Sequence, residues 1–251
     1  VRSREMSLNY EERLSDSPYV EKVTHGWTTG QGSTIRPAEV NWHMILTRHS
    51  GGTHFMLVGP LGTSGVAAWG GEAEILWIKL KLGTFMPHLP TRDFLESETT
   101  LPDASSRSFW LKGSAWQFPD YDNADTFVQK LVREEVLAHD PLVNAALQGE
   151  PTGMSPRTVR HRFLRATGLP QSHIVQFERA QRAVRLLRET ASIVETVYEA
   201  GYFDQPHLTR SLKQFIGYTP AQIIQMSRPE FCRSVQDNDP QPDYDATVLE
   251  K

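Results

Sequence analysis

Two short segments, 49 residues apart, carry side chains that can form hydrogen bonds with nucleic acid. Each opens with a residue that caps helices, Ser155 or Asp204, followed closely by a proline, and each ends at a glycine. Arg, Gln and Thr side chains read base edges, and Lys and Arg also hold phosphates. The candidates for such contacts are Arg157, Thr158, Arg160, His161, Arg165, Gln205, His207, Thr209, Arg210 and Lys213.

Apolar residues recur at the same offset. Val159 and Phe163 in the first segment match Leu208 and Leu212 in the second. Residues four apart share one face of a helix, so we expect these pairs to be buried and the polar candidates to lie opposite. A polar outer face is ordinary for a helix, but its repetition favours a function. Residues 172–188 predict a connecting helix about 26 Å long, comparable to one DNA turn of ~34 Å.

The charges are unevenly distributed along the 251 residues. The whole chain has a net charge of −4, but residues 141–235 hold 12 Lys/Arg and 7 Asp/Glu, a net charge of +5. The remainder is therefore at −9. A basic part beside an acidic part indicates nucleic-acid contact, although a solvated helical surface gives the same pattern.

The stretches 155–169 and 197–220 resemble the signatures of the AraC family of transcription regulators. The resemblance covers about residues 124–226. It implies two helix-turn-helix units joined by a long helix, with two recognition helices in successive major-groove segments of double-stranded DNA. It also implies which positions read bases: Arg157, Arg160 and His161 in the first unit, and Gln205, Pro206, His207 and Arg210 in the second.

Three departures from the family pattern are visible. His161 stands where the family often has Arg, which weakens base reading there. Pro206 has no side-chain hydrogen-bonding group. The turn before Ser155 is longer than usual, so we expect the first unit to contact DNA differently.

The N-terminal half predicts strands. Residues 20–28, 40–48, 53–58, 66–69 and 75–82 are short runs rich in β-branched and aromatic residues, punctuated by Gly pairs and Gly-Pro. This spacing is typical of a sandwich or small barrel.

Residues 78–87 resemble, more weakly, the cupin-like sensor half of AraC-type regulators, which binds a small effector, dimerises, or does both. The expected fold class is α+β with two domains, a cupin-like β-barrel or sandwich and an all-α double helix-turn-helix. We place a sensor or dimerisation domain at 1–122, the DNA-binding domain at 123–228, and an acidic, disordered tail at 229–251.

All six tryptophans lie in the N-terminal half. Aromatic side chains line small-molecule sites but also fill small barrels. Our candidate effector pocket consists of Trp42, His43, Trp69 and Trp77. The alternatives are that these residues are plain core, and that this half serves only for dimerisation or protein contact.

A cupin-type metalloenzyme is the rival class. His25, His43, His49 and His54 lie among the predicted strands, and imidazole suits several metals. Metal-binding cupins usually place two histidines one residue apart, and no His-x-His occurs here. The sequence also lacks a nucleophile elbow, a phosphate loop and a Cys-x-x-Cys. We therefore expect no metal, no cofactor and no catalysis.

Compartment and partners follow from a few further features. The single cysteine, Cys232, allows no internal disulfide, no apolar run approaches the roughly 18 residues that span a bilayer, and no signal peptide is visible. We expect a cytoplasmic protein without a membrane partner. The expected partners are double-stranded DNA, a small-molecule effector, RNA polymerase and a second copy of the chain.

Overall fold

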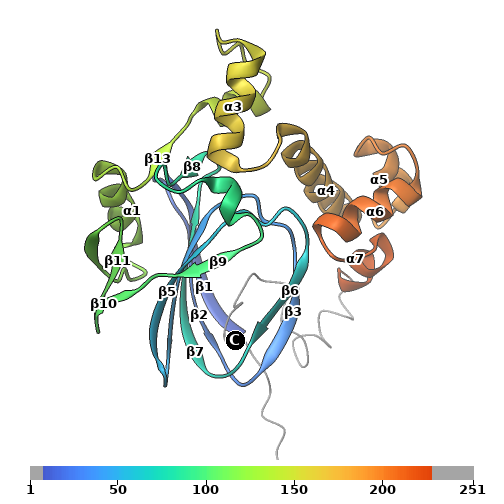
Figure 1. Cartoon of the computed structure of the whole chain (residues 1–251). Coiled ribbons are helices and arrows are strands. Elements are labelled where there is room, and N and C mark those ends of the chain that lie inside the picture. Colours follow the sequence, from blue (N-terminus) through green and yellow to red (C-terminus); the bar gives the residue numbers. More distant parts are fainter. Residues whose placement is uncertain (1–7, 228–251) are drawn as a thin grey trace, which may run out of the picture.

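The structure, a computed structural model, describes residues 8–227. A strand-rich N-terminal part is followed by a helical C-terminal part (Figure 1). The predicted α+β class with two parts is confirmed. The predicted acidic tail and Cys232 lie outside the described residues.

The main sheet has six strands and is antiparallel throughout. Its order is β1 (Leu8–Leu14), β2 (Val20–Thr28), β7 (Ala73–Leu80), β4 (His43–His49), β5 (Gly52–Val58) and β9 (Glu98–Thr100). A second, two-stranded sheet pairs β3 (Gly32–Arg36) with β6 (Gly65–Trp69) and curves across from the first (Figure 1). Among the described strands, β1 and β9 are the two ends of the main sheet. A sandwich therefore describes this half, and a closed barrel does not.

Residues 88–122 contain short regular elements. A 3-10 helix, η1 (Thr91–Phe94), is followed by β10 (Asp103–Ser105), β11 (Ser108–Leu111) and β12 (Ser114–Gln117), which form a three-stranded sheet. Another small sheet pairs β8 (Thr84–Phe85) with β13 (Ala138–His139). The second pairing joins the strand-rich part to the segment that leads into the helices.

Alternation along the strands gives the main sheet two buried faces. On β4, Met44 and Leu46 face one side and belong to the large core cluster with Phe55 and Phe109. Ile45 faces the other side, where it forms a smaller cluster with Trp77 and other apolar residues. Successive side chains of a strand point to opposite faces, so a continuous apolar run fills both.

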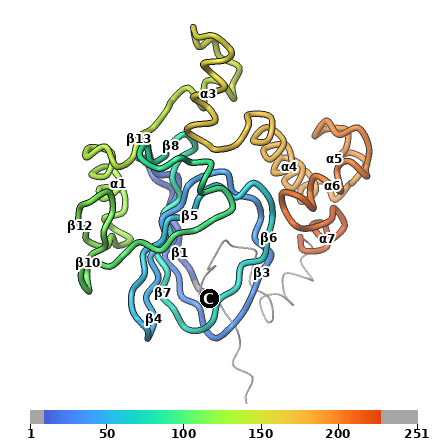
Figure 2. Tube along the Cα trace, viewed as in Figure 1, coloured from blue at the N-terminus to red at the C-terminus, as the bar shows by residue number. Residues whose placement is uncertain are grey.

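Seven helices lie in the described C-terminal part: α1 (Ala124–Arg133), α2 (Leu142–Leu147), α3 (Pro156–Thr167), α4 (Gln171–Thr190), α5 (Ile193–Glu199), α6 (Gln205–Phe215) and α7 (Pro220–Met226). The predicted connecting helix is α4, which starts one residue earlier and ends two later than expected. Its 20 residues make a rod of about 30 Å between α3 and α5 (Figure 2).

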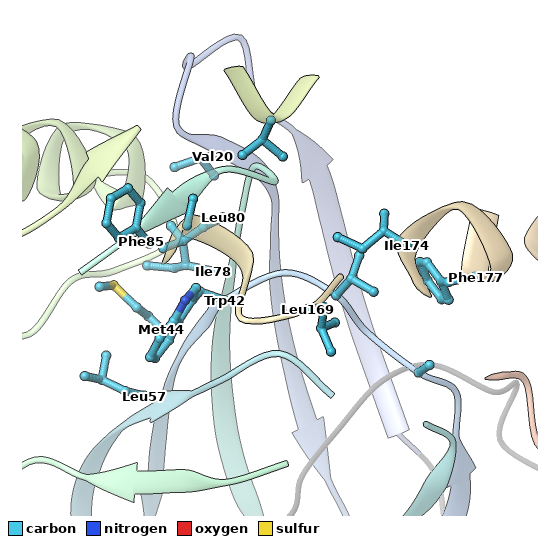
Figure 3. Packing of buried hydrophobic residues seen from close by; sticks show 14 of the residues in the cluster. Val20, Trp42, Met44, Leu57, Ile78, Leu80, Phe85, Leu169, Ile174 and Phe177 are labelled. Atoms are coloured by element: carbon cyan, nitrogen blue, oxygen red, sulfur yellow. The ribbon is translucent and has the colours of Figure 1, made fainter. Parts of the chain in front are cut away.

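The core runs without interruption from the strands into the helices. Leu169 and Ile174, at the corner between α3 and α4, belong to the same buried cluster as Trp42 and Ile78 of the strand-rich part (Figure 3). Helix α1 also packs on the strands, because the ring of Phe127 meets aromatic rings of β5, β11 and β12 edge-on. Within residues 8–227, no helix combines the length and apolar character needed to cross a membrane.

Candidate nucleic-acid interface

Helices α2 and α3 form the first helix-turn-helix unit. The hydroxyl of Ser155 accepts a hydrogen bond from the backbone N–H of Thr158 at 3.2 Å, and Pro156 occupies the first helical position. Gly168 ends α3 in the left-handed conformation, at φ +70°. Capping at one end and a glycine at the other fix the length of the helix, as the sequence predicts.

Helices α5 and α6 form the second unit on the same plan. The carboxylate of Asp204 accepts from the backbone N–H of His207 at 2.7 Å, and Pro206 lies in the first turn of α6. The chain turns after α6 at Gly217, which adopts φ +88°. The repeat found in the sequence is therefore a repeat of structure.

The buried faces of α3 and α6 agree with the expectation from the sequence. Phe163, Leu208 and Leu212 are fully buried, and Val159 is half-buried against the same core. The opposite faces are open to solvent over most of their length. Eight of the ten candidate residues are exposed, namely Arg157, Thr158, Arg160, His161, Arg165, Gln205, Arg210 and Lys213.

The other two candidates are half-buried and have local partners. The ring of His207 meets the ring of Tyr202 edge-on, with centroids 5.1 Å apart. The hydroxyl of Thr209 donates to the backbone carbonyl of Gln205 at 2.9 Å. Both residues help to shape the start of α6.

The C-terminal end of α3 contacts the strand-rich part. The guanidinium of Arg165 lies 5.6 Å from the centroid of the Phe85 ring on β8. Its backbone carbonyl accepts from the hydroxyl of Thr91, in η1, at 2.9 Å. Arg165 is therefore fixed beside the other half of the molecule, which the sequence did not indicate.

The C-terminal end of α6 is held more extensively. The carbonyls of Gln214 and Phe215 accept from the backbone N–H groups of Ser64 and Ala38, at 2.7 and 2.6 Å. The Ser64 hydroxyl also donates to the carbonyl of Lys213, at 2.8 Å. The last carbonyls of a helix have no partner within it, so these contacts satisfy groups that otherwise need water. The sequence contains no signal for this contact.

The turns within the two units differ. Residues 148–155 separate α2 from α3, whereas only 200–204 separate α5 from α6. In the first unit, which has the longer turn, the guanidinium of Arg162 donates two hydrogen bonds to the carboxylate of Asp140, at 3.0 and 2.6 Å. The carboxylate also raises the pKa of that guanidinium. Arg162 thus holds α3 to the segment before α2.

The proposed effector residues do not gather at one place. His43 and Trp77 share the face of the sheet that looks toward β3 and β6, and the Trp77 indole N–H donates to His43 Nδ1 at 2.6 Å. Trp42 faces the other way and packs against Phe94, with ring centroids 5.4 Å apart. Trp69 is half-buried at the end of β6, over Gly32. His43 and Trp77 are therefore in contact, whereas Trp42 and Trp69 lie apart from them and from each other.

His43 lies in a charged surrounding. Its side chain is fully buried, and its Nε2 atom has no hydrogen-bond partner among the described residues. Burial lowers the pKa of His43 well below its ordinary value, and the charges of Lys79, Arg36 and Lys22 lower it further. His43 is therefore neutral at pH 7.

Lys79 keeps its charge in the same region. Its ammonium lies 3.0 Å from a carboxylate oxygen of Glu21 and 3.1 Å from one of Glu39. Burial alone would lower the pKa of Lys79, but the two carboxylates outweigh this effect and raise it. A neutral imidazole thus lies beside a compensated cation.

A small cavity of about 130 Å³ opens on this face of the sheet. None of the four proposed effector residues lines it. Its lining residues are Arg36, Ile45, Val58, Leu61, Val66, Glu96, Ser97 and Glu98. Its walls are aliphatic and charged, so the positions of the tryptophans in the sequence do not indicate it.

The four histidines considered as metal ligands are dispersed. His49 and His54 stack at the β4–β5 hairpin, with ring centroids 5.2 Å apart, while His25 lies between carboxylates of Glu11 and Glu74. Within residues 8–227, no group of three or more His, Cys, Asp or Glu side chains is placed to hold a metal ion.

Comparison with known proteins agrees with the helical geometry. Residues 150–226, from the turn before α3 to the end of α7, match a family model described as a helix-turn-helix domain, of the AraC type. No curated protein sequence matches the chain.

Two solved structures of ToxT from Vibrio cholerae overlap the chain. One is described as strain O395 protein bound to (E)-4-(8-methylnaphthalen-1-yl)but-3-enoic acid; it is 9% identical, with a TM-score of 0.40, over 90% of this chain and 100% of that one. The other, a P21 form, is 8% identical, with a TM-score of 0.40, over 89% and 99%. The family match and the paired units identify residues 150–226 as an AraC-type helix-turn-helix domain, and the chain is a DNA-binding transcription regulator.

Proposed function

We propose that the chain reads a specific DNA sequence with the N-terminal halves of α3 and α6. One observation carries this proposal: both helices have exposed, polar N-terminal halves, whereas their C-terminal ends lie against the strand-rich part. In helix-turn-helix proteins the start of the recognition helix contacts base edges. The free ends here are the ends that such a contact requires.

The ten candidates divide by position. Arg157, Thr158, Arg160 and His161 on α3 and Gln205 and Arg210 on α6 lie in exposed places suited to base or phosphate contact. His207 and Thr209 support the start of α6, and each leaves part of its side chain exposed for contact with DNA. Arg165 and Lys213 lie near the inter-part contacts, so we assign them to phosphates at the edge of the DNA footprint.

We propose the domain division of the sequence analysis, at 122/123 and 228/229, with α1 fastening the two parts. The N-terminal part then acts as sensor through the cavity beside Arg36 and Ile45. Its volume is below the ~300–1,000 Å³ typical of drug-sized ligands, so the effector is a molecule of few atoms or one that widens the cavity. The guanidinium of Arg36 suits an anionic group, and the carboxylates of Glu96 and Glu98 in the same wall suit a cationic group, so we expect an effector that carries both.

Further partners belong to the same proposal. A regulator that activates transcription contacts RNA polymerase. Two copies of the DNA site would be bound by a homodimer. The regulator acts in the cytoplasm, where the chromosome of a bacterium lies. We propose no catalysis.

Selection from a randomised duplex library with the full chain tests DNA reading. We expect one enriched sequence, and an affinity that falls steeply between 50 and 200 mM salt because phosphate contacts release counterions. Enrichment of no sequence would refute sequence-specific reading. Arg107→Ala is a suitable control, because Arg107 is an exposed cation between β10 and β11, outside both recognition helices.

A panel of small zwitterions, with simple carboxylic acids and phosphates for comparison, tests the sensor. A true effector raises the thermal transition with concentration by mass action, and it changes DNA affinity by the same factor by which DNA changes effector affinity. Arg36→Met should abolish both effects. If a compound stabilises the protein equally in the Arg36→Met variant, it binds elsewhere, and the cavity is not the sensor site.

A further inference from the structure

Phe203 is the most exposed large apolar residue in the described part of the chain, at 90% of its full accessible surface. It lies in the turn between α5 and α6, directly before the capping residue Asp204. An aromatic ring of this size costs free energy when it faces water. A single exposed ring needs no explanation by itself, but its position does.

The usual structural reason for an apolar residue at this position does not hold. The residue before a helix cap often packs against the fourth residue of the helix, which here is Leu208. Leu208 is fully buried, while the Phe203 ring stands in solvent. Only the backbone of Phe203 contacts the start of α6, because its N–H donates to His207 Nδ1 at 3.5 Å, and the ring takes no part in this contact.

The first unit has an apolar residue at the matching place, with a different environment. Met154 precedes the capping residue Ser155, is 42% exposed, and its sulfur accepts a hydrogen bond from Arg162 at 3.5 Å. Met154 is thus partly used within the fold. Phe203 leaves its whole ring available at the tip of the second unit.

The surroundings of Phe203 point to DNA. It is two residues before Gln205, whose exposed side chain belongs to the proposed reading surface. Helix α5 and its turn into α6 lie on the side of the helical part away from the strands (Figure 1). The strand-rich part contacts α6 only near its other end, through Gln214 and Phe215.

We propose that Phe203 reads a thymine by contact with its C5-methyl group in the major groove. This inference rests on the proposed function. The methyl group of thymine is the one apolar group on the major-groove edge of the base pairs, and a Phe ring matches it without a hydrogen bond. The turn before a recognition helix approaches that edge together with the start of the helix.

Methyl-group deletion tests the contact directly. The full chain is bound to its selected duplex, and each thymine is replaced in turn by deoxyuridine, which removes only the methyl group. We expect about a fourfold loss of affinity at one position, the equivalent of one buried methyl group. Phe203→Ala should lose about the same factor on the thymine duplex, and should lose nothing more at that position when deoxyuridine is present.

Tyr198→Ala is the matched control. Tyr198 is an aromatic residue of α5 with 84% exposure, so its removal changes surface character to a similar degree. This variant should keep the full methyl effect. Phe203→Leu should keep part of it. Because both positions are exposed, thermal unfolding should be unchanged.

Three results would overturn the inference. They are an undiminished methyl effect in Phe203→Ala at every thymine, a loss that is equal on all sequences, and full affinity of Phe203→Ala for the selected duplex. A loss that is equal on all sequences would place the ring against the DNA backbone, and full affinity would mean that the ring does not contact DNA. If the wild-type chain selects no sequence, the proposed function fails as well; if it selects one, only the Phe203 assignment is at stake.

Discussion

The two helix-turn-helix units share a plan but differ in chemistry. The reading face of α3 carries Arg157, Arg160 and His161, whereas that of α6 carries Gln205 and Arg210. The first unit enters its helix through a turn of residues 148–155, and the second through 200–204. The first is strongly basic; the second is nearly neutral and has an exposed aromatic ring.

This difference indicates a division of labour. Cations supply affinity that depends on salt and little on sequence, while amide and apolar contacts supply discrimination. We therefore expect α3 to contribute more of the binding strength and α6 more of the sequence preference. The inter-part contacts differ too, because α3 is held by a side chain and α6 mainly by backbone groups.

The largest effects should come from the buried anchors. Phe163→Ala and Leu212→Ala each remove a fully buried side chain, at about 2–5 kcal/mol of unfolding free energy. Chemical unfolding of the full chain measures the loss. The exposed neighbours Leu164 and Lys213 provide the controls, as Leu164→Ala and Lys213→Ala should cost far less. Wild-type stability in either anchor variant would mean that the helix faces are reversed.

The next largest effect separates base recognition from phosphate binding. Arg210→Ala should cost about 1–3 kcal/mol on the selected site and relax the preference at one base pair. Arg165→Ala should weaken all sequences about equally. Binding to a randomised library measures both.

The structure adds a complication for Arg165. Its guanidinium lies over Phe85, so its removal also loosens α3 from the strand-rich part. Phe85→Leu is the control, since it disturbs the ring contact and leaves the charge. If Arg210→Ala weakens every sequence alike, the proposed division between the two units is wrong.

Acidification should affect the second unit selectively. The folded protein holds His43 with a lowered pKa, mainly because of burial, so the unfolded chain takes up a proton near pH 6.5 while the folded chain does not. Stability is then complete above pH 6.5 and falls as the pH drops below it, by at most about 1.4 kcal/mol per pH unit. Urea unfolding of wild type and His43→Asn at pH 7.5, 6.5 and 5.5 measures this slope.

The variant should show a shallower slope. Some dependence should remain, because burial also lowers the pKa values of His88 and His139. His161→Asn, an exposed position on α3, is the control. Since His43 follows closely on the segment that contacts α6 through Ala38, acid should weaken the second unit first. Equal slopes in wild type and His43→Asn would show that His43 does not cause the loss of stability in acid.

The repeat explains why the helical part was predictable. Caps at Ser155 and Asp204 and glycines at 168 and 217 are local signals, and the structure places helix ends there because the cap and left-handed conformations depend on neighbouring residues alone. The strand at 20–28 was predicted to the residue for a similar reason. Alternation and β-branched residues are read within one segment.

What could not be predicted depends on distant partners. β1 was missed because its residues are polar and gain their order from pairing with β2. The hydrogen bond between Ala38 and Phe215 joins two backbone groups, so no side chain in the sequence indicates it. The effector candidates are all aromatic, but Trp42, directly before β4, and His43, its first residue, point to opposite faces of the sheet. The cavity has aliphatic and charged walls, which composition alone cannot locate.

The smallest effect distinguishes how the two recognition helices are held. Thr91→Val removes the hydroxyl that donates to the carbonyl of Arg165, at constant shape, and should cost about 0.5–1.5 kcal/mol of unfolding free energy. Ser64→Ala removes only the side-chain bond to Lys213, while the backbone bond to Gln214 remains, so it should cost less. DNA affinity measured beside stability shows the consequence: a freed α3 should change affinity in Thr91→Val, and α6 should keep its position in Ser64→Ala. An equal response of both variants would show that the two units are held in the same way, and the asymmetry between them would then be confined to their reading faces.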